Sequence, residues 1–302
     1  MKWSIKQLVE NKPWAGWLLF FITVVVVFFL GLLASSIMER RAEAQFVYTP
    51  KVEFDSLEPR NEIWGENFPR EYATYLQTSD TTFKSLFNGN GLNDALKEDP
   101  DMIILWAGYA FSKDYNQPRG HFYAITDIRN TLRTGAPNDT TPSPQPNTCW
   151  TCKSPDVPRL MAKIGIQKFY HGSWDQLGSE VVNPIGCGDC HDNKNMNLKI
   201  TRPALIEAFQ RQGKDVNKST QQEMRSLVCA QCHVEYFFDS RDNKYKYLTF
   251  PWDSGMTVES MEKYYDNFNF SDWTHAISKA PMLKAQHPDY EVFKLGVHYR
   301  AG

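Results

Sequence analysis

The sequence lacks cysteines outside three short pairs, low-complexity tracts and any marked excess of charge of one sign. Its 33 basic and 35 acidic side chains leave a formal charge of -2, which gives no reason to expect nucleic-acid binding. Strand signals are few and short, and the cysteine pair is the one element that recurs. These absences leave a mainly helical protein whose chemistry is concentrated at its paired cysteines.

One long apolar run, residues 17–37, contains no charged side chain. About 20 such residues span a bilayer as a helix, and Trp14 and Trp17 stand at one end, as interfacial aromatic residues do. A cleaved signal peptide is the alternative, because Ala42-Glu43-Ala44 has the small-x-small pattern of a cleavage site. The run exceeds a signal core, however, and Glu39-Arg40-Arg41 separates it from that site. We therefore expect an uncleaved membrane anchor.

The anchor defines the expected organisation of the chain. We expect residues 1–14 on the cytoplasmic side, 15–37 in the membrane, 38–60 as a linker, and 61–302 as a helical domain with long loops. Lysines precede the span and arginines follow it, so the positive-inside rule leaves its orientation open.

Each cysteine pair has the spacing Cys-x-x-Cys. Two pairs continue with histidine, in Cys187–His191 and Cys229–His233, and this pattern is typical of c-type haem attachment. The thiols form thioethers to the haem vinyl groups, and the histidine becomes an axial iron ligand. The first pair, Cys149 and Cys152, continues with Lys153 instead. A lysine binds iron only as the neutral amine, so this residue indicates a haem that differs from the others.

Other interpretations of the cysteines stay open. Paired thiolates are common zinc ligands, although a zinc ribbon usually places its pairs closer together and needs no histidine after the second cysteine. Thioredoxin-like redox pairs have the same spacing, but three in one chain would be unusual. Taken alone, Lys153 is read as an ordinary solvated lysine. If the pairs hold haem, residues after about 38 lie in the periplasm, because covalent haem is attached outside the bacterial cytoplasmic membrane.

Local patterns predict several elements of the domain. The proline-rich stretch 136–147 predicts a loop. Thr201-Arg202-Pro203 predicts the start of a helix that ends at Gly213. Thr220 and Glu223 predict a capping box for a helix that leads into the third cysteine pair. Two further helices are expected, at 271–280 and 290–298.

The order of these motifs resembles the ammonia-forming cytochrome c nitrite reductases, pentahaem enzymes whose catalytic haem is held by Cys-x-x-Cys-Lys. The resemblance runs from about Trp64 to the last residue and includes Arg119–Ala124, Thr131–Pro137 and Lys284–Pro288. It implies a mainly α, multihaem c-type cytochrome with an N-terminal transmembrane helix. It also implies the six-electron reduction of nitrite to ammonium, with bis-histidine haems relaying electrons and with haem c and Ca²⁺ as cofactors.

The resemblance implies a catalytic pocket built around Lys153, the proximal ligand of the catalytic haem. Arg133, Tyr236 and His287 would form the distal side, where a guanidinium binds a small anion and a phenol and an imidazole supply protons. The calcium ligands would be the side-chain oxygens of Glu235 and Gln286 and the backbone carbonyls of Tyr236 and Lys284.

The resemblance also implies the residues that hold the haems. His121 matches the distal ligand of the haem attached through the third pair, and His298 matches the distal ligand of the family's fifth haem. His171 and His275 match no motif, and we expect them to be structural. The complete expected haem-binding set is Cys149, Cys152, Lys153, Cys187, Cys190, His191, Cys229, Cys232, His233, His121 and His298.

The family continues beyond the position of Gly302 with two further haem sites and with helices that form a dimer. We therefore expect an N-terminal part of a longer protein rather than a trihaem protein, and the distal ligand of the His191 haem stays unassigned. The implied partners are nitrite, a membrane-bound quinol-oxidising cytochrome c, the membrane and a second copy of the chain. The alternatives are a non-catalytic multihaem electron carrier, and a related reductase of hydroxylamine or sulfur oxyanions.

Overall fold

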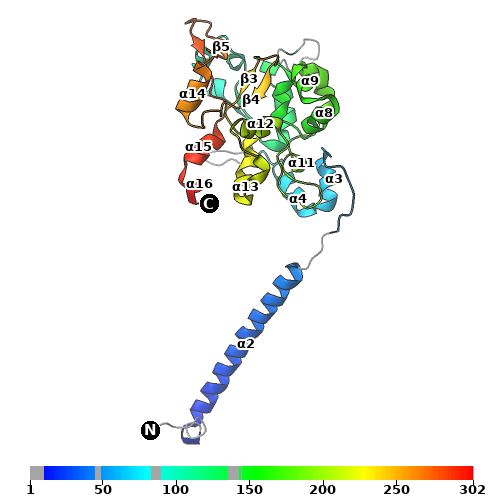
Figure 1. Ribbon diagram of the computed structural model, residues 1–302. Coiled ribbons are helices and arrows are strands. Elements are labelled where there is room, and N and C mark those ends of the chain that lie inside the picture. Colours follow the sequence, from blue (N-terminus) through cyan, green and yellow to red (C-terminus); the bar gives the residue numbers. More distant parts are fainter. Residues whose placement is uncertain (1–9, 45–48, 83–89, 135–142, 144, 302) are drawn as a thin grey trace. The chain divides into compact units, whose positions relative to one another are not determined.

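The computed structural model describes residues 10–44, 49–82, 90–134, 143 and 145–301. The chain divides into two compact units, Met1–Pro50 and Lys51–Gly302. Helix α2 (Pro13–Ala44) forms the first unit (Figure 1), and its segment Pro13–Ala42 has a mean hydropathy of 2.9. By length and composition this helix is sufficient to cross a membrane, and a signal sequence would meet the same criterion. The predicted apolar helix is confirmed.

The segment that follows the apolar run differs in part from the predicted linker. Residues 38–44 continue helix α2, because this stretch is rich in good helix formers. At the other end, Lys51 and Val52 donate backbone N–H groups to Asn67 Oδ1 at 2.8 and 3.0 Å. Asn67 Nδ2 donates in turn to the Val52 carbonyl at 2.8 Å. Residues 51 and 52 therefore already belong to the second unit.

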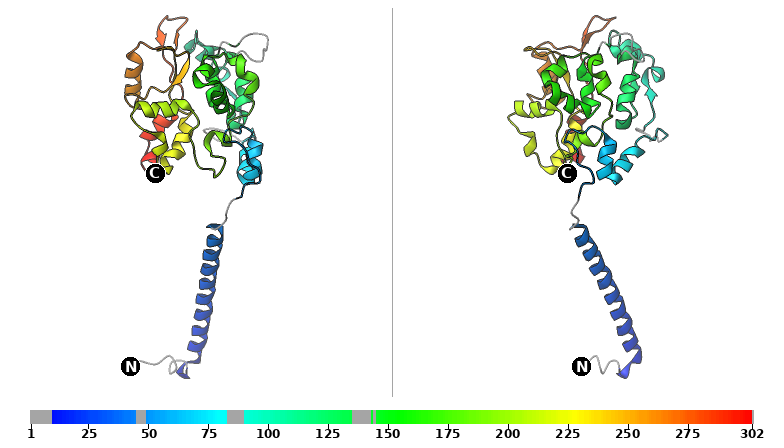
Figure 2. Two further views of the ribbon diagram at one scale, coloured as in Figure 1. Left: turned by 45° about the vertical axis from the view of Figure 1, so that its right-hand side comes forward. Right: turned by 90° about the vertical axis from the view of Figure 1, so that its right-hand side faces the viewer.

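The second unit consists of short helices joined by long loops, and two further views show that the helices run in many directions (Figure 2). Its α-helices are α3 (Asn61–Asn67), α4 (Pro69–Gln77), α5 (Ala95–Glu98), α6 (Met102–Leu105), α7 (Ala124–Arg129), α8 (Asp156–Ile164), α9 (Ile166–His171), α10 (Trp174–Leu177), α11 (Cys187–Cys190), α12 (Pro203–Arg211), α13 (Gln221–Ala230), α14 (Val258–Asp266), α15 (Asp289–Leu295) and α16 (Val297–Ala301). Its 3-10 helices are η1 (Ala110–Ser112), η2 (His121–Tyr123), η3 (Leu132–Thr134), η4 (Asn147–Cys152), η5 (Gly178–Glu180) and η6 (Val216–Lys218).

The strands of the described chain pair only locally, in three antiparallel ladders. They are β1 (Asn93–Asp94) with β2 (Asn116–Gln117), β3 (Phe237–Asp239) with β4 (Tyr247–Thr249), and β5 (Trp273–Thr274) with β6 (Pro281–Met282). In the longest ladder Phe238 lies opposite Leu248. The prediction of a mainly α protein with few short strands is confirmed.

Two predicted helix starts are confirmed by their caps. Pro203 occupies the first turn of α12, where its missing N–H leaves no hydrogen bond unmade, and α12 ends just before Gly213, whose φ is +70°. At α13, the Glu223 N–H donates to Thr220 Oγ1 at 3.2 Å, and the Thr220 N–H donates to Glu223 Oε2 at 2.7 Å. These caps are local, which is why the sequence alone predicts them.

The helix predicted at 271–280 is wrong, and the structure has the hairpin β5–β6 there. His275 Nε2 bonds to the Ile104 carbonyl at 2.8 Å, and its Nδ1 accepts the Ser278 N–H at 3.1 Å. These contacts hold a turn and give His275 the structural role expected of it. Tertiary contacts therefore override the local helix preference. Gly296 also interrupts the predicted 290–298 helix and separates α15 from α16.

The predicted loop at 136–147 lies largely outside the described residues, which resume fully at Gln145. Pro146 then forms an isolated antiparallel bridge with Ser173, and η4 begins directly after it. This bridge therefore fixes the chain directly before the first cysteine pair.

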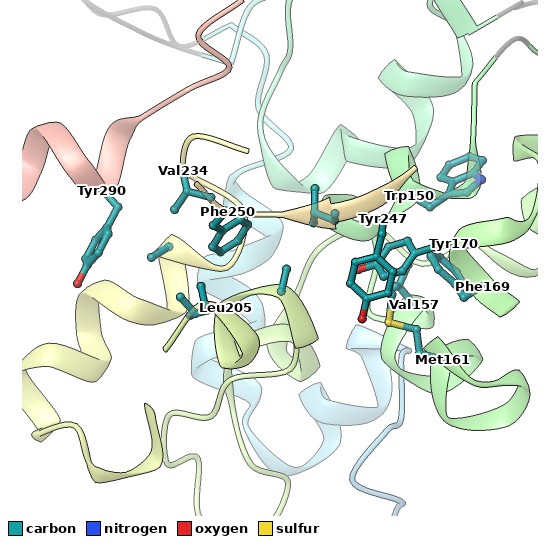
Figure 3. Packing of buried hydrophobic residues seen from close by; sticks show 14 of the residues in the cluster. Trp150, Val157, Met161, Phe169, Tyr170, Leu205, Val234, Tyr247, Phe250 and Tyr290 are labelled. Atoms are coloured by element: carbon teal, nitrogen blue, oxygen red, sulfur yellow. The ribbon is translucent and has the colours of Figure 1, made fainter. Parts of the chain in front are cut away.

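A cluster of buried hydrophobic residues includes Trp150 of the first cysteine motif (Figure 3). Trp150, the first spacer residue of that pair, is 0% exposed and stacks on Trp174. Tyr170 from α9 packs on Tyr247 from β4 with ring centroids 4.4 Å apart, and Leu205 from α12 belongs to the same cluster. Burial of this apolar surface anchors the first pair to the helices and to β4.

Candidate functional site

Each cysteine pair is one helical turn. The first lies in η4, the second forms α11, and the third begins at the end of α13. The residue after each pair closes the turn: the N–H of Lys153 donates to the Trp150 carbonyl, and those of His191 and His233 donate to the Cys187 and Cys229 carbonyls, all at 2.9 Å. Residues three apart share a helix face, so this spacing presents both thiols on one side.

The three pairs converge on one cavity of about 840 Å³, a size typical of cofactor sites. It is lined by side chains from all three motifs, among them Cys152, Lys153, Cys190, Cys229, Cys232 and His233. None of the six cysteines, all of which lie in the described residues, forms a disulfide. At least one cysteine of each pair thus lines a space that suits a bound cofactor.

The competing interpretations of the cysteines fit less well. Within the described residues, no group of three or more His, Cys, Asp and Glu side chains is arranged to hold a metal ion, as a zinc ribbon would need. Burial raises the pKa of Cys149 to about 12 and that of Cys187 to about 11. A redox pair needs the opposite, a first thiol with a lowered pKa.

The two motif histidines are oriented as metal ligands usually are. His191 Nδ1 bonds to the Met196 carbonyl at 2.7 Å, and His233 Nδ1 bonds to Asp289 Oδ2 at 3.0 Å. Such a bond fixes the tautomer and leaves Nε2 for the metal. Met196 and Asp289 were not predicted, because only the tertiary structure brings them to the imidazoles. Both histidines therefore fit a haem iron through Nε2.

His121 faces His233 across the cavity. The two ring centroids lie 6.1 Å apart. An iron between two imidazoles, with metal–nitrogen bonds of about 2 Å each, requires a centroid separation of about 6 Å. His121 begins η2 directly after Gly120, whose φ of +95° turns the chain there. The His287 ring lies 5.9 Å from that of His233, so two imidazoles meet this distance criterion, and His121 is the one that the family motif predicts. The other predicted distal ligand, His298, lies exposed on α16 and does not line the cavity.

Arg133 and His287, two residues of the predicted distal pocket, line the same cavity as Lys153. The third, Tyr236, packs on His287 with ring centroids 5.3 Å apart. Arg133 extends from η3 over the Phe111 ring at 4.7 Å. The structure thus brings together residues that the sequence places in three distant segments.

The electrostatics of this pocket favour the neutral forms of His287 and Tyr236 beside the charged Arg133. Burial, together with the charges of Lys153, His233 and Lys284, lowers the pKa of His287 to about 4. Its Nδ1 has no hydrogen-bond partner among the described residues. Burial raises the pKa of Tyr236 well above its usual value. The buried polar atom of His287 is therefore available for a small polar ligand.

Three of the predicted calcium residues, Glu235, Lys284 and Gln286, are joined by hydrogen bonds beside this pocket. Glu235 Oε2 accepts the Gln286 N–H at 2.6 Å, and Glu235 Oε1 accepts the Tyr265 hydroxyl at 2.8 Å. The Lys284 ammonium donates to Gln286 Oε1 at 2.8 Å and to the Ala285 and Gln286 carbonyls at 3.2 Å. Hard oxygen donors thus already surround a cation, and they suit calcium.

Burial shifts both charged groups of this cluster toward neutrality. It raises the pKa of Glu235 to about 7 and lowers that of Lys284 to about 8. A bound divalent cation would reverse the preference of Glu235 by favouring the carboxylate.

Comparison with known proteins places this geometry in a family. The cytochrome c552 family matches residues 60–302. The chain belongs to the cytochrome c552 family. It is 62% identical to cytochrome c-552 of Parabacteroides distasonis over 96% of this chain and 58% of that protein. It is 61% identical to cytochrome c-552 of Bacteroides fragilis over 96% of this chain and 59% of that protein. The chain thus spans a little under three fifths of these relatives.

A solved structure shares the fold. The catalytic subunit of cytochrome c nitrite reductase from Desulfovibrio desulfuricans matches with a TM-score of 0.72 and 33% identity, over 83% of this chain and 58% of that one. That protein is described as having two calcium sites. The resemblance drawn from the cysteine motifs is therefore confirmed at the level of family and fold.

Proposed function

We propose that this chain is part of an enzyme that reduces nitrite to ammonium at a haem ligated by Lys153. The observation that carries the proposal is the cavity shared by Lys153, Arg133 and His287. Nitrite, six electrons and eight protons would yield ammonium and two water molecules. The electrons would come from a membrane-bound quinol-oxidising cytochrome c. Haem c, when attached, supplies an iron that binds nitrite and passes electrons one at a time.

The pocket residues would bind the anion and deliver protons. Arg133 remains charged even though burial lowers its pKa, so its guanidinium can hold nitrite by charge-assisted hydrogen bonds. Tyr236 and His287 would donate protons as the bound oxygens gain charge. Lys153 would lose its own proton to serve as the proximal ligand.

Calcium would hold this pocket in shape. Glu235 and Gln286 would offer side-chain oxygens, and Tyr236 and Lys284 would offer backbone carbonyls. Tyr236 directly follows Glu235, and His287 directly follows Gln286. An ion bound by the first set would therefore restrain the second.

The remaining haem-binding residues would relay electrons. Cys187, Cys190 and His191 would hold one relay haem, whose distal ligand stays unassigned, and Cys229, Cys232, His233 and His121 would hold another. His298 would serve a further haem, the fifth of the family. The domain would lie in the periplasm, attached to the inner membrane by α2, and the full-length form would be a homodimer.

The proposal is tested on the purified full-length protein. We expect covalent haem at all three motifs, and nitrite-dependent oxidation of a reduced dye with ammonium as product. Lys153→His should retain haem but change the activity, whereas Lys168→His on the exposed face of α9 should behave as wild type. A fully haem-loaded protein that makes no ammonium from nitrite contradicts the proposal. Activity with hydroxylamine or sulfite alone would identify a related reductase instead.

A further inference from the structure

The second spacer residue of each cysteine pair is buried. Thr151, Asp189 and Gln231 are 0%, 3% and 2% exposed. Spacer residues of a haem attachment motif have no required chemistry, and two of these three are strongly polar. A polar side chain in such a position needs hydrogen-bond partners.

A single arginine bonds to residues of all three motifs. Arg202, the residue before α12, is 1% exposed. Its Nε donates to the Thr151 carbonyl at 2.6 Å, and its Nη2 donates to the Ser154 carbonyl at 3.0 Å. The same Nη2 forms an ion pair with Asp189 Oδ1. The guanidinium thus connects the first pair to the second.

Gln231 connects the third pair to the same point. Its Oε1 accepts the backbone N–H groups of Thr201 at 2.5 Å and Arg202 at 3.0 Å. Its Nε2 donates to the Asp189 carbonyl at 3.2 Å. Thr201 Oγ1 donates to that carbonyl as well, at 2.9 Å. The three motifs are therefore joined through one buried hydrogen-bonded network around Arg202.

This network lies next to the atoms that would hold the haems. Each spacer residue directly precedes the second cysteine of its pair, and that cysteine precedes Lys153, His191 or His233. Arg202, Asp189 and Gln231 also line the central cavity. A displacement of the network would consequently move three attachment points together.

The chemistry of the network suits positioning better than stability. Arginine keeps its charge in proteins, and its planar donors fix several acceptors in one geometry. Buried ion pairs often add little stability compared with apolar residues of the same size. A buried charge beside redox centres, however, acts through a medium of low dielectric constant. Its electrostatic effect on those centres is therefore strong.

We propose that Arg202 is a positioning residue that sets the relative placement of the three haem sites and, with Asp189, tunes how readily their irons are reduced. The inference rests on the proposed function only in requiring that haem is attached to the three motifs. It concerns a residue outside both the distal pocket and the calcium cluster.

The test compares variants of opposite charge in the full-length protein. Arg202→Met leaves a buried negative charge, which favours oxidised iron. At a given potential the ratio of oxidised to reduced iron in the neighbouring haems should rise threefold to tenfold, where tenfold is about 59 mV for one electron. Asp189→Asn leaves a positive charge and should favour the reduced iron. The double variant should return toward wild type. Arg211→Met, at the surface end of α12, is the matched control and should leave the potentials unchanged.

The readouts are covalent haem per chain and the reduction potential of each haem, measured by spectroelectrochemistry. If Arg202→Met fails to mature, Gln231→Glu replaces it, because it adds a negative charge to the same network at nearly constant size. Unchanged reduction potentials in the haem-loaded variants would overturn the inference. Potential shifts of the same sign in all variants would overturn it too, because a nonspecific loosening of the structure around the haems predicts them. A wild-type protein without covalent haem would instead contradict the proposed function.

Discussion

The lysine motif and the third histidine motif face different partners within one cavity. His233 faces a second imidazole, that of His121, with ring centroids 6.1 Å apart. Lys153 shares the cavity with Arg133, whose guanidinium suits an anion, and with His287, whose ring also lies 5.9 Å from that of His233. The comparison teaches that the irregular residue of the first motif is matched by a different distal side. The surroundings of Lys153 include a guanidinium, whereas two imidazoles flank His233.

The largest effect is expected at Arg133, which lines the same cavity as Lys153 and would bind the substrate. Arg133→Leu should lower the kcat for nitrite about 100- to 1000-fold, because it removes a fixed charged donor from the pocket. Haem content should remain that of the wild type. Dye-coupled nitrite kinetics measure the loss, with the exposed Arg70→Leu on α4 as control. A loss below tenfold would show that Arg133 does not stabilise the reacting anion.

The second effect concerns the proposed calcium site, which would hold the pocket around Lys153 in shape. Removing calcium with a chelator, or introducing Glu235→Gln, should lower activity about 10- to 100-fold, as loss of an orienting partner does. Added calcium should restore the chelated wild type but not the variant, and calorimetry should detect binding only in the former. Glu259→Gln at the exposed start of α14 serves as control. Full activity after proven calcium removal would refute the structural role of the ion.

The third effect concerns the haem held by His233, which would lose one of its two axial ligands. His121→Ala should open the haem held by His233, so that carbon monoxide binds to two reduced haems rather than one. The potential of that haem should rise, within the range of roughly 0.8 V that axial ligands cover. Absorption and electron paramagnetic resonance spectra of the haem-loaded variant measure both changes. An unchanged low-spin spectrum would exclude His121 as the ligand.

The smallest effect on activity is expected at Asp239, on the strand that follows Tyr236. Burial favours its neutral form, but hydrogen bonds from Arg241 and Lys244 outweigh this and lower the pKa of Asp239 below its usual 3.8. The carboxylate therefore contributes stability above that pH and loses it as the pH falls through the lowered pKa.

Asp239→Asn should accordingly reduce the free energy of unfolding by about 1.5–3 kcal/mol at pH 7. The difference from wild type should disappear in strong acid. Denaturant unfolding at several pH values tests this, with activity at pH 7 nearly unchanged. A difference that persists unaltered at low pH would exclude the carboxylate as its source.

Prediction from sequence succeeded where the signal is local. The apolar helix and the caps of α12 and α13 each depend on residues that are close together in the chain. It failed at 271–280, because the contact of His275 with the Ile104 carbonyl joins segments far apart in the chain. The positions of Arg133, Tyr236 and His287 were predicted through family resemblance, and their proximity is a property of the fold.

The sequence by itself determined the three cysteine motifs, the one among them that departs from histidine, and the apolar segment. These are properties of neighbouring residues, and the chemistry of thiols, amines and imidazoles can be assigned without a fold. The tertiary structure alone decided that His121 faces His233, that Asp289 orients His233, and that Arg202 joins all three motifs. Such contacts bring together groups that are distant in the chain, and only packing of the helices around the cavity fixes which of them meet.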